Sequence, residues 1–159
     1  MHTSQLALLI GGAGTGIASL MHVAIIVGGP DWYRFFGAGE RMARLAAAGS
    51  PYPAIVTAGI AMILGVWAIY GLSAAGLIRK LPGVRAALTL IAAVYLLRGV
   101  LGVPVVLLVD DSYTRQLRDK MTFMVVSSLI CLVLGACYAL GASGEGTSAK
   151  RRCSPRART

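Results

Sequence analysis

Four long runs of apolar residues alternate with short polar stretches along this chain of 159 residues. The runs cover about 6–27, 54–78, 86–109 and 122–142, and Arg98 is the only Lys, Arg, Asp or Glu within them. A helix of about 20 apolar residues spans the hydrocarbon core of a bilayer, which is roughly 30 Å thick. Because the runs are continuous rather than alternating, they favour helices over barrel strands. The pattern predicts an all-α fold, a bundle of four transmembrane helices.

Composition agrees with a membrane protein, since 57% of the residues are hydrophobic and 13% are charged, against roughly 25% charged in soluble domains. The net charge of +9 would suggest nucleic acid in a soluble protein. Here the basic residues lie between the apolar runs and in the tail, so we expect the lipid bilayer as partner and no nucleic acid. Residues 1–5 lack the Lys or Arg of a signal peptide, so we interpret the first run as a retained helix.

The basic residues between the runs predict the orientation, because cytoplasmic loops carry more Lys and Arg than external loops. With both termini in the cytoplasm, the inner side holds Arg79, Lys80, Arg85, Lys150, Arg151, Arg152, Arg156 and Arg158. The outer side then holds Arg34, Arg41, Arg44, Arg115, Arg118 and Lys120. We therefore expect a multi-pass protein of the bacterial inner (plasma) membrane with both termini cytoplasmic. Residues 1–142 form the transmembrane domain, and residues 143–159 form a basic tail that we expect to be disordered.

The connection between the first two runs, 28–53, is long enough to have structure of its own. On a helical wheel its aromatic residues gather on one side and its arginines on the other, with Glu40 placed to pair with Arg44. This predicts an amphipathic external segment along the outer membrane surface. Its membrane-interface anchor would be Trp32, Tyr33, Phe35 and Phe36. Gly37 and Gly39 favour a break or re-entrant turn as the alternative, and a lid over an outer cavity is a further one.

Small residues at helical spacing indicate close contact between helices, either within the chain or between chains. The first run contains Gly12 and Gly16 in a GxxxG spacing, which fits helix packing better than a phosphate-binding loop because no strand precedes it. Similar pairs occur in two other runs: Ala61 with Gly65, and Gly135 with Ala139. The short linker 79–83 predicts that the second and third runs are antiparallel neighbours.

Arg98 is the polar group that most needs an explanation, because a cation inside a membrane helix costs about 2.5–3.5 kcal/mol on insertion scales. At about 1.5 Å per residue it lies roughly 20 Å from Arg85, in the outer half of the bilayer. The candidate polar cluster at this depth, with its external residues, is His22, Arg34, Glu40, Thr57, Tyr95, Arg98 and Ser127. Alternatively, the hydroxyl groups bond to their own helices, and Arg98 extends outward or pairs with Glu40.

No metal, cofactor or catalytic signature accompanies these residues. Cys131, Cys137 and Cys153 lack the spacing of a zinc site or a disulfide framework. There is no arrangement typical of a Ser/His/Asp enzyme. We therefore expect no metal and no cofactor, and an enzyme is not favoured.

Three motifs carry a resemblance to a known group of proteins: Trp32 to Glu40, Tyr95 to Gly99, and Ser127 to Cys131. With these motifs the chain resembles a group of short bacterial four-helix membrane proteins without an assigned activity. In its layout of one helix, an external segment and three further helices, it is also remotely similar to DoxX-like proteins. The resemblance implies the four-helix membrane fold and transfers no site residue.

Two functions follow as hypotheses. The first is a structural or accessory protein that acts through its helix bundle, as a homo-oligomer or as a subunit of a membrane complex. The second is a transporter or membrane enzyme that binds an anionic or amphipathic small molecule in an outer-half cavity near Arg98. An acidic ligand would explain a cation in that position.

Overall fold

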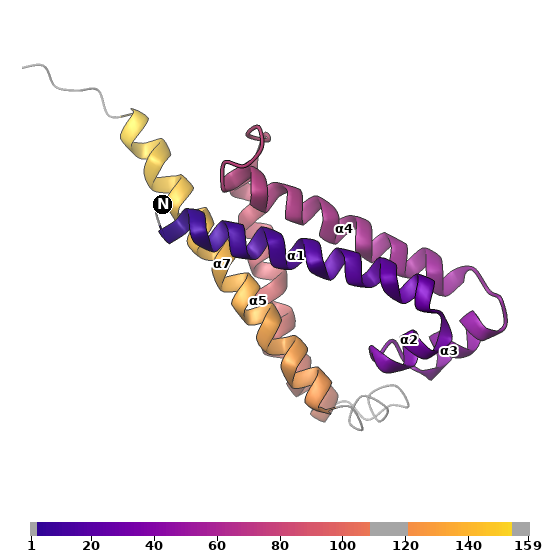
Figure 1. The fold of residues 1–159 in the computed structure, drawn as a ribbon. Helices are drawn as coiled ribbons and strands as arrows, with labels where there is room; N and C mark the ends of the chain where they lie inside the picture. The colour runs from indigo at the N-terminus through magenta and orange to yellow at the C-terminus, as the bar shows by residue number, and fades with distance from the viewer. Residues whose placement is uncertain (1–2, 109–120, 154–159) are drawn as a thin grey trace, which may run out of the picture.

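The structure, a computed structural model, describes residues 3–108 and 121–153, with the backbone alone for residues 145–153. Its helices are α1 (Thr3–Gly28), α2 (Pro30–Phe35), α3 (Glu40–Ala47), α4 (Tyr52–Ala74), α5 (Val84–Leu108) and α7 (Met121–Cys153) (Figure 1). No strand occurs within the described residues. Helices α1, α4, α5 and α7 are long and apolar enough to cross a membrane. The predicted all-α fold with four apolar helices is therefore confirmed, and it supports a multi-pass membrane protein.

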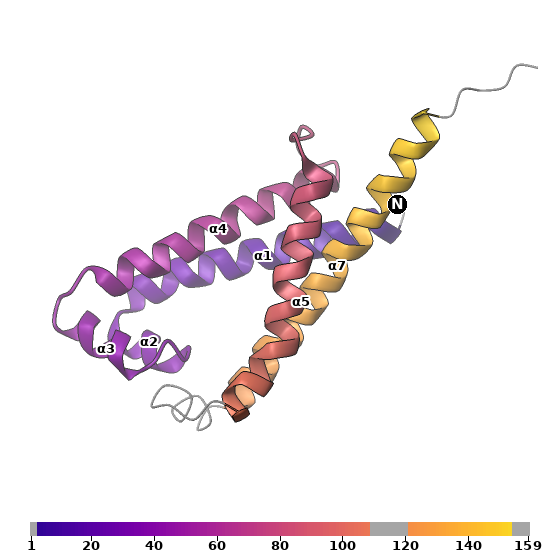
Figure 2. The same cartoon turned by 180° about the vertical axis from the view of Figure 1, so that it is seen from behind.

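The four long helices form two antiparallel pairs, α1 with α4 and α5 with α7. The pairs meet where the first half of α1 crosses the second half of α7, and they diverge from there (Figures 1 and 2). The start of α1, the α4–α5 linker and the end of α7 share one end of the molecule, here called the linker end. Helices α2 and α3 lie at the opposite end, here called the cap end.

Missing side chains bring α1 and α4 close together. A Cβ atom added at Gly71 would lie only 2.9 Å from Gly12 Cα, and one added at Gly16 would lie 3.7 Å from Ala68 Cβ. Further along, Ser19 Oγ donates a 2.7 Å hydrogen bond to the Ala61 carbonyl. The predicted GxxxG contact is therefore made inside the chain, as expected where small residues let backbones approach.

Glycines also let α7 pack closely against its two neighbours, α5 and α1. A Cβ added at Gly135 would lie 2.8 Å from Leu96 Cγ of α5, and one added at Gly14 of α1 would lie 2.8 Å from Leu134 Cδ2. The α1–α7 contact of this kind closest to the linker end is between Gly144 and Ser4. Packing between α1 and α7 is thus concentrated toward the linker end, and the two pairs separate toward the cap end.

Helices α4 and α5 are not the extensive neighbours that their short linker predicts, because they meet near the linker and then belong to different pairs. Helix α4 ends at Ala74 rather than near residue 78. Gly76, at φ 85°, allows the Leu77 N–H to bond back to the Leu72 carbonyl at 3.1 Å, the geometry of a Schellman cap. The linker then folds onto buried Ser73, whose Oγ donates to the Arg79 carbonyl and accepts from the Leu81 N–H, both at 3.0 Å.

The segment between α1 and α4, which we expected on the outer side and call the external segment, is broken into α2 and α3 rather than being one amphipathic helix. Gly37 and Gly39 adopt φ of 73° and 92° at the break, a region that residues with a Cβ rarely enter. The Ala38 N–H bonds to the Tyr33 carbonyl at 3.0 Å and closes the end of α2. Of the alternatives left open by the sequence, the glycine break is the one observed.

Helix α7 continues through the segment for which we expected disorder and ends at Cys153. Extending an existing helix adds one hydrogen bond for each residue fixed, so a formed helix can continue into polar sequence. Residues 154–159 of the predicted tail lie outside the described residues.

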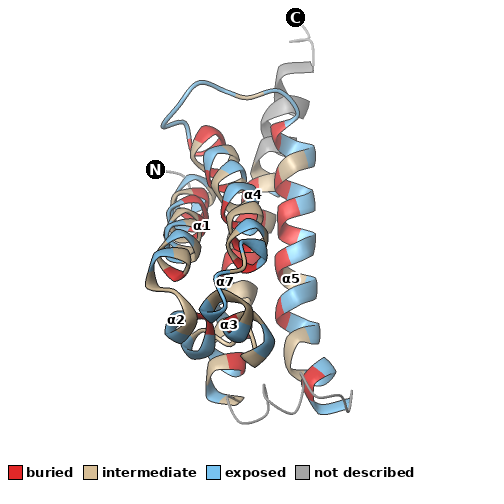
Figure 3. Cartoon of the chain, turned by 90° about the vertical axis from the view of Figure 1, so that its right-hand side faces the viewer, coloured by how far each residue is buried: buried red, intermediate tan, exposed pale blue. Residues whose placement is uncertain are grey.

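Most large apolar side chains face outward rather than into a core. Figure 3 shows exposed positions along the side of α5 that is turned away from the other helices. Val27, Leu20 and Met62 are 84%, 70% and 70% exposed. Soluble proteins rarely expose apolar surfaces this extensive to water, so these surfaces are suited to contact with lipid. The interior is small and centres on Leu88, Ile91, Tyr95 and Tyr138.

Candidate functional site

Three members of the predicted polar cluster are satisfied by their own helices. Thr57 Oγ1 donates to the Pro53 carbonyl at 2.8 Å, and Ser127 Oγ donates to the Met124 carbonyl at 3.0 Å. His22 Nδ1 lies 2.7 Å from the Ala18 carbonyl, which can only accept, so this contact places a proton on Nδ1. The structure forms no hydrogen bond among His22, Thr57 and Ser127 in the part of the chain that it describes.

Tyr95 joins a different group, a hydroxyl hub that connects all four long helices. The Tyr95 hydroxyl donates to Thr15 Oγ1 at 3.2 Å. The Tyr138 hydroxyl lies 3.1 Å from Thr15 Oγ1 and 3.1 Å from the Trp67 carbonyl. A carbonyl only accepts, and each hydroxyl has one proton to donate. Tyr95 therefore donates to Thr15, Thr15 donates to Tyr138, and Tyr138 donates to the Trp67 carbonyl.

Aromatic contacts reinforce this hub. The Tyr95 and Tyr138 rings are stacked with centroids 6.1 Å apart, and Trp67 meets Tyr95 edge to face at 5.5 Å. Thr15 and Tyr138 have no exposed surface. Buried, hydrogen-bonded and without a charged neighbour in the hub itself, these side chains fix the crossing of the helices rather than present a ligand site.

The sequence reasoning missed Thr15, Trp67 and Tyr138. The signal available was that hydroxyl groups in a membrane run face the bundle interior, where other helices supply partners. Which hydroxyl meets which helix depends on the crossing of α1 and α7, and residue spacing alone does not contain that information.

Arg98 lies on the exposed side of α5. Its guanidinium lies beside Gly102, one turn further along α5 and nearer the cap end. Within the described residues it forms no ion pair. Glu40, the partner considered from the sequence, is instead bound to arginines of the external segment.

Ser128 stands next to this guanidinium. A Cβ added at Gly102 would meet Arg98 Nη1 and would also lie 2.6 Å from Ser128 Oγ. Ser128 is 4% exposed, and its hydroxyl has no hydrogen-bond partner among the described residues. Arg98, Gly102 and Ser128 therefore form a polar notch on the α5–α7 pair, with a cation at its edge and an unsatisfied hydroxyl inside.

A second polar group ties the cap end together. Arg34 Nε donates to Glu40 Oε2 at 3.0 Å, and Arg34 Nη1 donates to Asp31 Oδ1 at 3.0 Å. The predicted pair between Glu40 and Arg44 is also present, at 3.9 Å. The hydrogen bond from Arg34 lowers the pKa of the Glu40 carboxyl, and the same bond raises the pKa of Arg34. Arg34 thus joins α2 to α3 across the glycine break.

The four predicted anchor residues have different surroundings. Phe35 and Trp32 are 70% and 43% exposed and can meet lipid headgroups. Tyr33 is buried against Ile25 and Ala43, with a hydroxyl that has no partner among the described residues. Phe36 meets Phe123 of α7 with centroids 6.3 Å apart. The external segment, which follows α1, therefore also touches the α5–α7 pair at the cap end.

No group of three or more potential metal ligands occurs in the described part of the chain. Cys131 and Cys137 are free and half-buried on α7. No known protein family, curated protein or solved structure matches the chain.

Proposed function

We propose that the chain is a structural or accessory membrane protein that assembles, through the polar notch on α5 and α7, with a second copy or with another membrane protein. The observation that carries the proposal is the exposed Arg98 beside the unsatisfied Ser128 hydroxyl. Polar groups on a membrane helix associate with partners because lipid tails satisfy none of their hydrogen bonds.

The surroundings of Arg98 strengthen this argument. Its neighbours on the exposed side of α5 include Leu97 and Leu101, which are 61% and 44% exposed. At about 1.5 Å per residue, Arg98 lies about 15 Å from the Leu108 end of the helix. A partner that brings a carboxylate or carbonyl oxygen to this notch would accept hydrogen bonds from the exposed guanidinium.

The small-residue faces support this notch over a GxxxG interface. Gly12, Gly16 and Gly71 are already in contact between α1 and α4, so they are not available for another chain. The two helix pairs diverge toward the cap end (Figure 2).

The test compares the oligomeric state of the wild-type chain and Arg98→Leu in detergent and in nanodiscs. We expect a wild-type dimer or higher oligomer, by light scattering or by native mass spectrometry with any co-purifying protein, and a loss of more than tenfold in association for Arg98→Leu. Arg98→Lys keeps the charge and should retain part of the association. The control Leu97→Ala changes a neighbouring exposed side chain and should have no comparable effect. A wild-type protein that remains monomeric without any partner would contradict the proposal.

A second candidate function rests on the same notch, since the exposed Arg98 guanidinium carries several donors suited to an anion. A transporter or enzyme for an anionic small molecule would use the guanidinium as its ligand contact. In that case the wild-type chain would be monomeric and would bind a carboxylate or phosphate probe, and Arg98→Leu would lose that binding while remaining folded. Oligomer loss and ligand loss are separate measurements, so the two functions are distinguishable.

For localisation we propose the bacterial inner membrane with both termini in the cytoplasm, in keeping with the resemblance to short bacterial four-helix proteins. The distribution of Lys and Arg supports the orientation. Reporter fusions test it: a cytoplasm-active reporter placed after residue 159 or in the 79–83 linker should be active, and one placed in the 48–51 turn should not. Activity at the 48–51 turn would reverse the orientation.

A further inference from the structure

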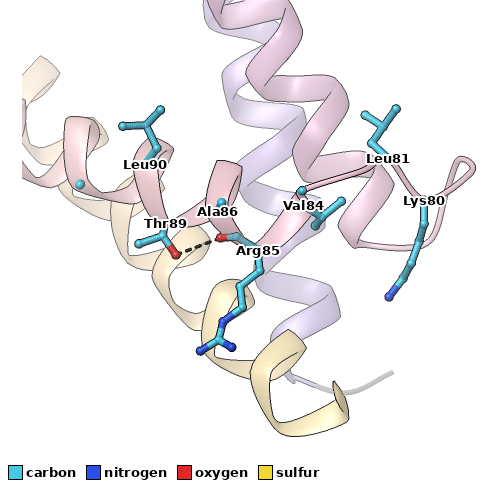
Figure 4. Close-up of a pocket in the computed structure, with 9 residues that line it drawn as sticks. Lys80, Leu81, Val84, Arg85, Ala86, Thr89 and Leu90 are labelled. Atoms are coloured by element: carbon cyan, nitrogen blue, oxygen red, sulfur yellow. Dashed lines mark hydrogen bonds between the residues drawn. The ribbon is translucent and has the colours of Figure 1, made fainter. Parts of the chain in front are cut away.

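A groove lies at the linker end, where the α4–α5 linker meets the first turns of α5. Its first part is a hollow of about 990 Å³, and its lining includes Lys80, Leu81, Val84, Arg85, Thr89 and Leu90 (Figure 4). The apolar members form the wall, and the two basic residues lie at the end nearest the linker. This combination of an apolar wall and a few polar groups is typical of ligand sites of roughly 300–1,000 Å³.

A second hollow of about 390 Å³ continues the groove along α5. It shares Arg85, Thr89 and Ala93 with the first and extends to Leu96, with Ala139 and Ala142 of α7 on its other side. From Arg85 to Leu96 the groove runs about 17 Å along the helix. One leaflet of the hydrocarbon core is about 15 Å thick, so the groove has the length of the membrane-buried part of one lipid chain.

The charge at the linker end of the groove is positive. In Figure 4 the charged ends of Lys80 and Arg85 both point down, one from the linker and one from the first turn of α5, and they lie apart in this view. Thr89 Oγ1 donates to the Arg85 carbonyl at 2.9 Å, so this hydroxyl is already bonded to its own helix. A negatively charged group would therefore be attracted to this end of the groove.

We infer that this groove binds one anionic phospholipid from the leaflet at the linker end, with the phosphate at Arg85, an acyl chain along Thr89, Ala93 and Leu96, and Lys80 adding positive charge from the linker. A free phosphate would use only the basic end and leave the apolar length unused. The chain's own basic residues 150–158 carry the same sign of charge as the groove. A phospholipid is the occupant that matches both the charge and the length.

The experiment measures lipid retention by native mass spectrometry of the full chain, released from nanodiscs that contain equal amounts of phosphatidylglycerol and phosphatidylcholine. We expect the wild-type chain to retain phosphatidylglycerol in preference. Each basic residue near the surface contributes about 1 kcal/mol, so Arg85→Gln and Lys80→Gln should each lower the preference about fivefold. Arg79→Gln is the matched control, because Arg79 is exposed on the same linker but does not line the groove.

A second pair of variants tests the apolar part without changing charge. Ala93→Phe fills the groove where the two hollows join, and we expect it to lower phosphatidylglycerol retention severalfold. Val94→Phe adds the same ring at the next residue, which is 41% exposed and outside both hollows, and retention should stay unchanged. Inorganic phosphate added in excess should not displace the lipid, because it makes none of the apolar contacts.

Two results would overturn the inference. An equal loss for Arg79→Gln and Arg85→Gln would mean that the basic linker attracts anionic lipid generally, without a site. Displacement by inorganic phosphate, or equal effects of Ala93→Phe and Val94→Phe, would mean that no acyl chain occupies the groove. Circular dichroism of each variant shows whether it is folded, and the Ala93 and Val94 pair provides the test if the charge variants are not.

Discussion

Thr15 and Tyr138 are 123 positions apart in the chain, and their hydroxyl groups lie 3.1 Å apart where α1 crosses α7. Both side chains are fully buried. Tyr95 and the Trp67 carbonyl complete the hub, so each of the four long helices contributes one member. This small hydrogen-bonded group lies where the two diverging helix pairs meet.

The hub predicts that Tyr138→Phe destabilises the folded bundle. Hydrogen bonds between membrane helices contribute about 0.6 kcal/mol on average and up to about 1.7 kcal/mol. We expect a loss in this range for Tyr138→Phe and a larger one for Thr15→Val, which removes the acceptor for Tyr95 as well. Unfolding by sodium dodecyl sulfate in mixed micelles measures both. The double variant should lose less than the sum, and strict additivity would show that the two hydroxyl groups are not coupled.

Two glycines of α4 predict opposite effects of the same substitution. Gly71→Ala should destabilise the fold by about 1–3 kcal/mol, because its Cβ would lie 2.9 Å from both Gly12 Cα and the Tyr138 hydroxyl oxygen. Gly59→Ala is the matched control, since a Cβ there has nothing within 4 Å. Because alanine favours a helix more than glycine does, Gly59→Ala should stabilise the fold by roughly 0.5–1 kcal/mol. The same detergent unfolding measurement checks both, and a similar sign for the two variants would contradict the α1–α4 contact.

The four helices and one of their close contacts could be predicted from the sequence. Continuous apolar runs identify the four helices because crossing a bilayer imposes a minimum length, and the GxxxG spacing of Gly12 and Gly16 correctly indicates a close contact. The pairing of helices was harder to predict. The short 79–83 linker suggested that α4 and α5 pack as antiparallel neighbours, whereas the close packing of α4 is with α1. Linker length limits only the distance between helix ends.

The candidate site shows the same limit. Depth along each helix placed Tyr95 and Arg98 in one layer, but the two side chains leave α5 in different directions, one into the hub and one along the exposed side. The groove at the linker end has no sequence motif, because its shape depends on how α5, α7 and the linker meet. Residue spacing gives the height of a side chain in the membrane, whereas helix rotation and crossing decide what it faces.

The ion pair between Arg34 and Glu40 predicts that the structure of the external segment changes with pH. Because the bond from Arg34 lowers the pKa of Glu40 in the folded cap, the ion pair contributes fully above the ordinary carboxyl pKa. That contribution is lost as the pH falls through the lowered value. Trp32, whose ring lies 5.8 Å from that of Phe36, should report the change by fluorescence in a Trp67→Phe background.

Two variants identify the group responsible for this transition. Glu40→Gln should remove it, and Asp31→Asn should leave it in place because the Asp31 side chain is 90% exposed and contributes least to Arg34. If the fluorescence change persists in Glu40→Gln, a different group titrates and the link between α2 and α3 through Arg34 does not control the cap.

We predict that the stability of the linker end depends on the Ser73 hydroxyl. Its buried Oγ bonds both the Arg79 carbonyl and the Leu81 N–H at 3.0 Å, so Ser73→Ala leaves a donor and an acceptor without partners. An unsatisfied buried group costs about 1–3 kcal/mol, and we expect the lower part of this range because Leu81 is half-buried.

The control is Ser143→Ala, where an exposed hydroxyl bonds its own helix at the Ala139 carbonyl, and its effect should lie within about 0.5 kcal/mol. Detergent unfolding gives both values, and faster hydrogen exchange at the Leu81 amide in Ser73→Ala alone would locate the loss in the linker. Equal stability of the two variants would show that the linker does not depend on Ser73.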